Sequence, residues 1–189
     1  VIHKAYITRD IKKRKKTKMS YKNKRKKEKE QVLVKEVLYM SVQDYLAAQK
    51  IGKREYNACV NKGKYPYLPV LENLISEDDI DSEVSIGNDQ IPLSLVVGTC
   101  NAARTNAFAG NFMPLLEWGT EFSAKWASLS DSQVNEGIRD PIKVYEYMNK
   151  FYVLEGNKRV SVLKYFKAVT VNAEVIRKVP KKSDKPEVK

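Results

Sequence analysis

The residues best suited to bind a ligand are the four consecutive positions 156–159, Gly156-Asn157-Lys158-Arg159, where a β-rich run gives way to a helical pattern. A glycine allows a sharp turn, and asparagine is a favourable residue at a helix start. Lys158 and Arg159 fall in the first helical turn, where each opposes the positive end of the helix dipole at a cost of about 0.3–1 kcal/mol. A bound anion would offset that cost, because backbone N–H groups and both cations would converge on it. We therefore predict phosphate binding at 156–159, with solvent-facing cations in an ordinary strand-to-helix turn as the alternative.

Two further residues are candidates for the same site. Glu155 precedes the loop directly and is interpreted either as a metal or ribose ligand or as the charge partner of Arg159. Arg104 is the only cation between Lys64 and Lys125 and lies among small residues. It is a candidate anion ligand, with structural hydrogen bonding as the alternative role.

The elements that must position these residues alternate between strand and helix signals from residue 84 to residue 179. The spacing of apolar residues indicates strands when it alternates and helices when it recurs every three or four residues. Pro114 is expected to kink or interrupt the first predicted helix. The predicted strands are 91–97, 142–147, 151–154 and 169–175, and the predicted helices are 105–118, 120–136 and one that begins at 157. This pattern predicts an α/β (α+β) domain.

Residues 41–76 are predicted to form a short helical hairpin. Ser41 is a plausible N-cap, and Gly52 is expected to end the first helix and Gly63 the second. The outline loosely resembles winged or MerR-like helix-turn-helix modules, in which the second helix would direct polar residues toward nucleic acid. An ordinary hairpin with a solvated polar face is the alternative. The candidate nucleic-acid contacts of this helix are Lys53, Arg54 and Asn57.

Positive charge is concentrated at the start of the chain. The formal net charge is +12, yet residues 1–30 alone hold 14 Lys and Arg against 3 Asp and Glu. A basic tail of this kind neutralises nucleic-acid phosphates, while an anionic membrane surface and a merely solubilising leader are the competing interpretations. Met19 could serve as a natural start, leaving 1–18 as upstream sequence. The predicted contacts in the tail are Lys12, Lys13, Arg14, Lys15, Lys16, Lys24, Arg25, Lys26 and Lys27, and residues 180–189 are predicted to form a charged C-terminal linker.

Several classes of protein are disfavoured by what the sequence contains. Cys59 and Cys100 stand far apart, which argues against a zinc cage or disulfide framework and favours reduced thiols in a cytoplasm. His3 is the single histidine, so no histidine-based triad or metal site is expected in the folded part. No apolar run approaches the roughly 20 residues of a membrane helix. The acidic stretch 77–83 lacks the glycine and closing glutamate of a calcium loop and is expected to be a solvated linker.

The order of elements, the segment 137–144, the hairpin ending in Leu154-Glu155-Gly156 and the Gly-x-x-Arg helix start together resemble the ParB/sulfiredoxin fold over about residues 91–179. The resemblance implies a small mixed sheet with helices, preceded here by the helical hairpin and the basic tail. The ParB loop reads Gly-Glu-Arg-Arg and holds nucleotide phosphates; Gly156 and Arg159 match it, and Lys158 keeps the charge. In sulfiredoxins a reactive cysteine occupies the position of Asn157, so sulfiredoxin chemistry is not expected here.

The resemblance implies a nucleotide- or nucleic-acid-phosphate-binding domain, DNA-associated or regulatory, in a bacterial cytoplasm. It also implies a nucleoside triphosphate with Mg²⁺ as cofactor, DNA as partner and a homodimer. If the chain is an enzyme, NTPase or nuclease activity is implied, although the Glu-Asn-x-x-Arg motif of ParB turnover has no counterpart. A metal-dependent phosphodiesterase with Glu155, Asp140 and Glu146 is one alternative function. A noncatalytic adaptor within a longer protein is the other.

Overall fold

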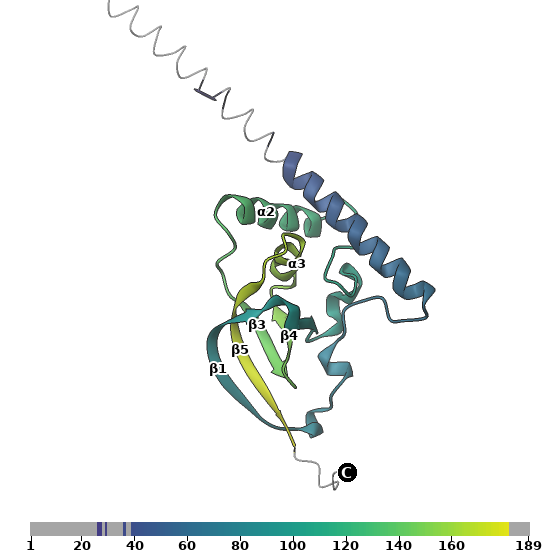
Figure 1. Cartoon of the computed structure of the whole chain (residues 1–189), viewed down its shortest axis with the longest axis vertical. Helices are drawn as coiled ribbons and strands as arrows, with labels where there is room; N and C mark the ends of the chain where they lie inside the picture. The colour runs from purple at the N-terminus through teal and green to yellow at the C-terminus, as the bar shows by residue number, and fades with distance from the viewer. Residues whose placement is uncertain (1–25, 28, 30–35, 37–38, 182–189) are drawn as a thin grey trace, which may run out of the picture. The chain divides into compact units, whose positions relative to one another are not determined.

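The computed structural model describes residues 26–27, 29, 36 and 39–181, apart from the side chain of Arg104 (Figure 1). Residues up to 40 and residues from 41 onward form two separate units. Lys26 and Lys27 are helical and exposed. The other predicted tail contacts (Lys12, Lys13, Arg14, Lys15, Lys16, Lys24 and Arg25) lie outside the described residues, as do residues 182–189 of the predicted linker.

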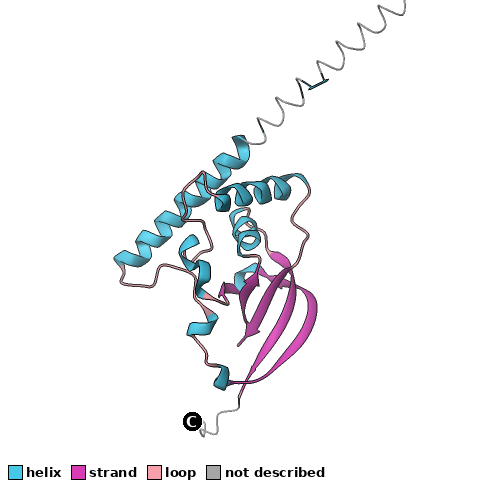
Figure 2. Ribbon diagram, turned by 180° about the vertical axis from the view of Figure 1, so that it is seen from behind, coloured by secondary structure: helices cyan, strands magenta, loops and turns pink. Residues whose placement is uncertain are grey.

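Five strands form one mixed sheet, drawn in magenta in Figure 2. The strand order is β1-β5-β3-β4-β2, with antiparallel pairs β1–β5 and β3–β4 and parallel pairs β5–β3 and β4–β2. The predicted α/β fold with a small mixed sheet is therefore confirmed. The strands are β1 Ile80–Pro92, β2 Val96–Thr99, β3 Ile142–Tyr147, β4 Lys150–Glu155 and β5 Thr170–Pro180.

The β3–β4 hairpin closes through a two-residue turn. Met148 and Asn149 both have positive φ, 52° and 61°. A turn of this type matches the right-handed twist of the strands that it joins. The predicted hairpin is confirmed, and the predicted last strand is β5, which runs on to Pro180 along the whole of β1.

Two α-helices pack on the sheet where the sequence predicts them. They are α2 Glu121–Asn135 and α3 Asn157–Tyr165. The hydroxyl of Thr120 caps α2 by accepting a hydrogen bond from the backbone N–H of Ser123. In Figure 1, α3 lies between α2 and the sheet. The indole Nε1 of Trp126 donates to Ser161 Oγ at 2.8 Å and joins the two helices inside the core.

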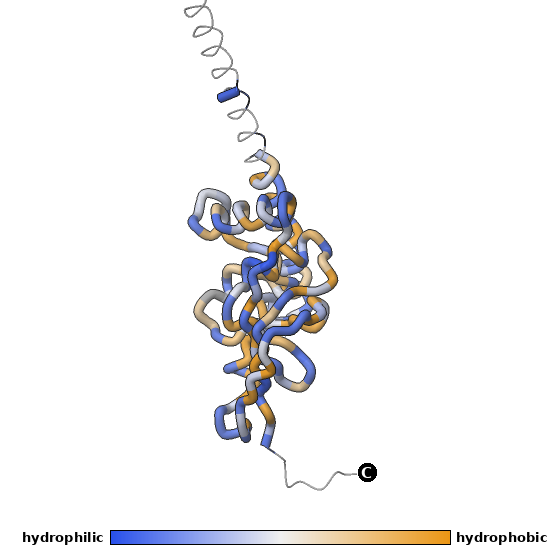
Figure 3. Tube along the Cα trace, turned by 90° about the vertical axis from the view of Figure 1, so that its left-hand side faces the viewer, coloured by the Kyte–Doolittle hydropathy of each residue, from blue (hydrophilic) through white to orange (hydrophobic). Residues whose placement is uncertain are grey.

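The core lies on the helix-covered face of the sheet, because strand side chains alternate between the two faces. Ile142 and Val144 in β3 and Val171, Ala173 and Val175 in β5 are all buried there. Hydrophobic and hydrophilic stretches accordingly interchange along the tube in Figure 3. The remaining elements are the short 3-10 helices η1 Leu71–Asn73, η2 Glu77–Asp79, η3 Leu93–Leu95 and η4 Ala102–Ala107.

The predicted helical hairpin is wrong, because residues 41–61 form one continuous helix that passes through Gly52. Gly52 is buried, and a Cβ added there would lie 2.5 Å from the carbonyl oxygen of Pro114. The glycine is thus present for close packing and not for a turn. Tyr45 and Ala48 of this helix belong to the same core as Trp126, so residues 41–76 pack with the sheet domain. Lys53, Arg54 and Asn57 are exposed on this single helix, which removes the helix-turn-helix interpretation.

The predicted helix 105–118 is also wrong. Its first residues belong to η4, and turns and isolated bridges follow. Pro114 has no N–H for a helical bond, and Phe112 has φ 68°, outside the right-handed region. Phe108 and Phe112 are nevertheless fully packed in the core. The four-residue spacing of Phe108 and Phe112 therefore results from burial in the core and not from a helix.

Two strand boundaries also differ from the prediction. The predicted strand 91–97 is interrupted by η3, which begins after Pro92. The acidic stretch 77–83 is not a linker, because it forms η2 and the start of β1. The sheet domain therefore includes residues before 84, and β1 is extended by its pairing with β5.

The packing of Gly52 gives the first prediction. Gly52→Ala should lower the free energy of unfolding by about 1–3 kcal/mol, because the added methyl group collides with the Pro114 carbonyl. Helix propensity alone predicts the opposite sign, a gain of about 0.5–1 kcal/mol. Urea unfolding of the variant and of the unmodified protein measures the change in the free energy of unfolding. Ala58→Gly at an exposed position of the same helix is the matched control and should cost about 0.5–1 kcal/mol. A stabilised Gly52→Ala protein would contradict the packing.

Candidate functional site

The predicted site lies at the carboxyl end of the parallel strands β2 and β4. Thr99 ends β2 and pairs with Val153 of β4, and α3 begins two residues after β4 ends. η4, which contains Arg104, follows β2 at the same edge. Ligands of α/β proteins commonly bind outside the carboxyl ends of parallel strands. The fold thus brings the start of α3, residues 156–159, and the backbone of the Arg104 segment to one edge of the sheet.

The entrance of α3 is a left-handed glycine without a capping side chain. Gly156 has φ 109° and is the N-cap residue, while no side chain accepts a hydrogen bond from the first turn and no acidic residue lies in that turn. A Cβ at Gly156 would lie 2.7 Å from Ile142 Cγ2. Glycine is required here both by the backbone conformation and by this contact.

Asn157 is the first residue of α3, so the capping role expected for it falls to Gly156. Its Nδ2 donates to Thr99 Oγ1 at 3.1 Å, and that hydroxyl donates to the Val153 carbonyl, also at 3.1 Å. Asn157 Oδ1 is buried and has no hydrogen-bond partner among the described residues. An unpaired buried acceptor costs about 1–3 kcal/mol. The site therefore holds an acceptor that a ligand or water donor would satisfy.

Arg159 is engaged by the protein itself. One guanidinium nitrogen, Nη1, donates to the carbonyl of Asp140 at 3.3 Å and to that of Pro141. The other, Nη2, lies 3.4 Å from Glu155 Oε1, and only 19% of the arginine side chain is exposed. Of the alternatives for Glu155, the charge pair with Arg159 is the one observed. Arg159 ties the start of α3 to the segment before β3 and is a positioning residue in this structure.

Lys158, the other cation of the first turn of α3, lies beside the entrance. The Nζ atom of Lys158 is 4.9 Å from the ring centroid of Phe122 at the start of α2. The attraction between an ammonium group and an aromatic face holds the side chain near the first turn of α3. Two positively charged residues of this turn therefore differ in role, with Arg159 bonded to the wall of the site and Lys158 placed over an aromatic ring.

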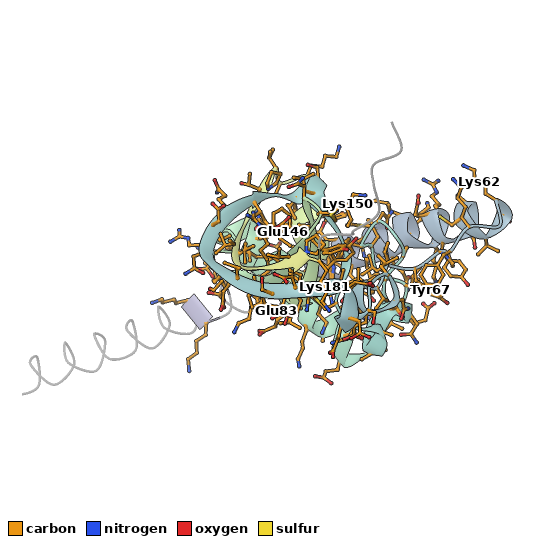
Figure 4. The ribbon with its side chains drawn as sticks, turned by 90° about the horizontal axis from the view of Figure 1, so that it is seen from below. Lys62, Tyr67, Glu83, Glu146, Lys150 and Lys181 are labelled. Atoms are coloured by element: carbon orange, nitrogen blue, oxygen red, sulfur yellow. The ribbon has the colours of Figure 1, made fainter. Side chains whose placement is uncertain are left out.

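The three carboxylates proposed for a nuclease do not converge. Glu155 and Asp140 both lie near Arg159, but Glu146 sits four residues along β3 from Ile142, roughly 13 Å at the usual rise of a strand. Glu146 is buried, pairs with Arg177 and accepts from the backbone N–H of Asn149 at 2.8 Å. Figure 4 shows Glu146 beside Lys150, at the turn end of β3 and β4. Within residues 39–181, no three or more His, Cys, Asp or Glu residues are grouped to hold a metal ion.

The pKa values of both cysteine thiols are raised. Burial raises the pKa of the Cys100 thiol to about 12. The pKa of the Cys59 thiol is also raised, by desolvation and by its hydrogen bond to Glu55. Because the thiolate is the reactive form, both shifts oppose sulfiredoxin-type attack.

A pocket beside Arg159 was missed by the sequence analysis. It has a volume of about 330 Å³ and lies between the end of α2 and the segment 136–140. Leu129 and Ser132 of α2 and Arg139 of the segment are among its lining residues. The sequence signal for this pocket is a single glycine, Gly137, in the segment before β3. In the structure Gly137 has φ 76°, and the chain turns sharply there.

Comparison with known proteins identifies one distant structural neighbour. No protein-family model matches the chain, and no curated protein sequence matches it. Sulfiredoxin from Arabidopsis thaliana is similar in structure, with a TM-score of 0.33 and 17% sequence identity over 47% of this chain and 82% of that chain. A TM-score this low supports no inference about activity or ligand. Among the described residues, no helix combines the length and apolarity needed to cross a membrane.

The bonds of Arg159 give the second prediction. Arg159→Gln should lower the free energy of unfolding by about 1–3 kcal/mol, because two backbone carbonyls lose a charged donor. Glu155→Gln should cost only about 0–1 kcal/mol, since that carboxylate is largely exposed. Chemical denaturation of both variants measures the two losses in the free energy of unfolding. Equal costs, or no cost for Arg159→Gln, would show that the guanidinium does not position the segment before β3.

Proposed function

We propose that this chain is a ParB-like domain that binds a phosphate-bearing ligand, a nucleotide or a nucleic-acid phosphate, at the entrance of α3. The observation that carries the proposal is the first turn of α3, which begins at a left-handed glycine and has neither a capping side chain nor an acidic residue. Backbone N–H groups at such an entrance point toward the ligand, and the helix dipole favours negative charge there.

The surrounding side chains support the same chemistry. Lys158 adds positive charge at the first turn, and Arg159 fixes the turn through the carbonyls of Asp140 and Pro141. The unpaired Asn157 Oδ1 can accept from a donor, and sugar hydroxyls of a nucleotide carry such donors. Phosphate on the backbone N–H groups and a hydroxyl on Asn157 would together satisfy the polar groups of the entrance.

The proposal is of binding and not of turnover. Among the described residues, Glu155 is the carboxylate nearest the entrance in sequence, and it is paired with Arg159. Asp140 is exposed and contributes its backbone carbonyl to the same arginine. A general base or metal ligand would have to be released from these contacts before it could act, so a regulatory binding domain fits the geometry better than a phosphodiesterase.

A ligand titration tests this function. Inorganic phosphate and a nucleoside triphosphate, each with and without Mg²⁺, should raise the Tm of the protein, by the equivalent of about 2.7 kcal/mol at 100 times the Kd. Lys158→Glu should abolish the rise because it places a negative charge at the first turn of α3. Lys150→Glu, the same change at the β3–β4 turn, is the matched control and should retain it. No rise in the unmodified protein, or an equal loss in both variants, would refute the site.

A second function is favoured by the charge of the N-terminal segment. Residues 1–30 carry a net charge of +11, whereas the other 159 residues carry +1. We propose that this segment adds sequence-independent affinity for DNA, since each Lys or Arg placed on a phosphate releases counterions.

Salt dependence tests this second function on the full chain. Replacing Lys12, Lys13, Arg14, Lys15 and Lys16 by glutamine should flatten the plot of log K against log salt by up to about 4–5 units for duplex DNA. Fluorescence anisotropy at several salt concentrations measures the slope. An unchanged slope would assign DNA affinity, if present, to other residues. If the entrance of α3 holds a free nucleotide, the Lys158→Glu protein should keep the original slope. A flatter slope in that variant would show that a nucleic-acid phosphate occupies the entrance.

A further inference from the structure

The pocket between the end of α2 and the segment 136–140 is a preformed recess. Its volume of about 330 Å³ falls within the range of about 300–1,000 Å³ that is usual for small-molecule sites. It is lined by groups of three kinds, apolar, positive and negative. They are Leu129, Ser132, Glu136, Ile138, Arg139 and Asp140, together with Gly137 and Arg159.

The outer wall of the recess is rigidly held although it has no regular secondary structure. Four consecutive residues of the wall are each fixed by a hydrogen bond to a group elsewhere in the chain. The bonds are Gly137 N to the Ser132 carbonyl (3.0 Å), Ile138 N to Gln133 Oε1 (2.9 Å), Asn172 Nδ2 to the Arg139 carbonyl (3.3 Å) and Arg159 Nη1 to the Asp140 carbonyl (3.3 Å). A wall fixed in this way pays little entropy on binding a ligand.

Three charged side chains of the wall do not take part in the polar contacts that stabilise the described chain. Within residues 39–181, the guanidinium of Arg139 and the carboxylates of Glu136 and Asp140 make no hydrogen bond or ion pair. Arg159, in contrast, is occupied by Glu155 and two carbonyls. The residues that line the recess therefore include one positive and two negative side chains without a partner in the described chain, together with the apolar Leu129 and Ile138.

This combination discriminates between ligand classes. A simple anion attracted to Arg139 would meet two carboxylates, and a simple cation attracted to those carboxylates would meet Arg139. A molecule with both an anionic and a cationic group can pair with Arg139 and with one of the two carboxylates at the same time, and an aliphatic body would cover Leu129 and Ile138. We propose that the recess binds a small zwitterion of the amino-acid type with an aliphatic side chain. Its carboxylate pairs with Arg139, and its ammonium pairs with Asp140 or Glu136.

The inference does not rest on phosphate binding at α3, because the proposed contacts in the recess involve neither the first-turn N–H groups nor Lys158. It assigns recognition only, with no covalent step. The bidentate geometry of a guanidinium toward a carboxylate supplies orientation, and the aliphatic contact with Ile138 and Leu129 supplies selectivity against glycine-like ligands. The recess would thus recognise the carboxylate, the ammonium group and the side chain of its ligand.

The test uses L-leucine as the probe, added to the full chain and followed by calorimetry and by the NMR signals of Leu129 and Ile138. The two controls are 4-methylpentanoate, which lacks the ammonium group, and 3-methylbutylamine, which lacks the carboxylate. Leucine should bind at least about tenfold more tightly than either control, because each omits one charge pair. Absence of leucine binding, or equal binding of the three compounds, would overturn the inference.

Two substitutions localise the binding. Arg139→Gln should weaken leucine binding by about tenfold or more without lowering Tm, since the side chain is exposed and has no partner in the described chain. Arg54→Gln, the same change at an exposed position of helix 41–61, should leave it unchanged. Equal effects of the two changes would also overturn the inference. Phosphate-induced stabilisation should survive Arg139→Gln and be lost in Lys158→Glu, so that failure of one site is distinguishable from failure of the other.

Discussion

The contact of Gly156 with Ile142 is the constraint on which the rest of the domain depends. The chain must leave β4, reverse direction and enter α3 directly above the neighbouring strand, and the 2.7 Å between a notional Cβ and Ile142 leaves no room for any side chain. This sharp reversal places Ser161 against Trp126, so that α3 closes the core between α2 and the sheet. It also places Arg159 within reach of the Asp140 and Pro141 carbonyls. One left-handed residue therefore determines both the packing of the helices and the form of the site.

Local patterns predicted the elements whose structure is determined by neighbours in sequence. The alternation in β3 and β5, the hairpin at Met148 and Asn149, and the bounds of α2 all follow from short-range periodicity and turn preferences. Prediction failed where distant parts of the chain decide the conformation. Gly52 looked like a helix end but is the point where a continuous helix packs on the Pro114 backbone, and Phe112 looked helical but lies in a packed loop.

The same distinction applies to the site. The loop 156–159 could be found from sequence because glycine, a polar residue and two cations are adjacent. The partners of Arg159 could not, because they lie 18 and 19 residues earlier and are backbone carbonyls, which carry no sequence signature. The same is true of the hydrogen bond from Asn157 to Thr99, 58 residues away. The pocket lined by Arg139 could not be predicted from the sequence either. Its concave shape forms only when α2 and the segment 136–140 pack together.

Arg159 is part of both the α3 entrance and the lining of the recess, so binding at one place can affect binding at the other. Its α-carbon lies in the first turn of α3, while its guanidinium supports the Asp140 carbonyl in the wall of the recess. A phosphate that drew the guanidinium toward the helix would withdraw that support, and an occupied recess would resist the withdrawal. Occupancy of the two places would then be negatively linked, and linkage of this kind is reciprocal, with each ligand weakening the other by the same factor.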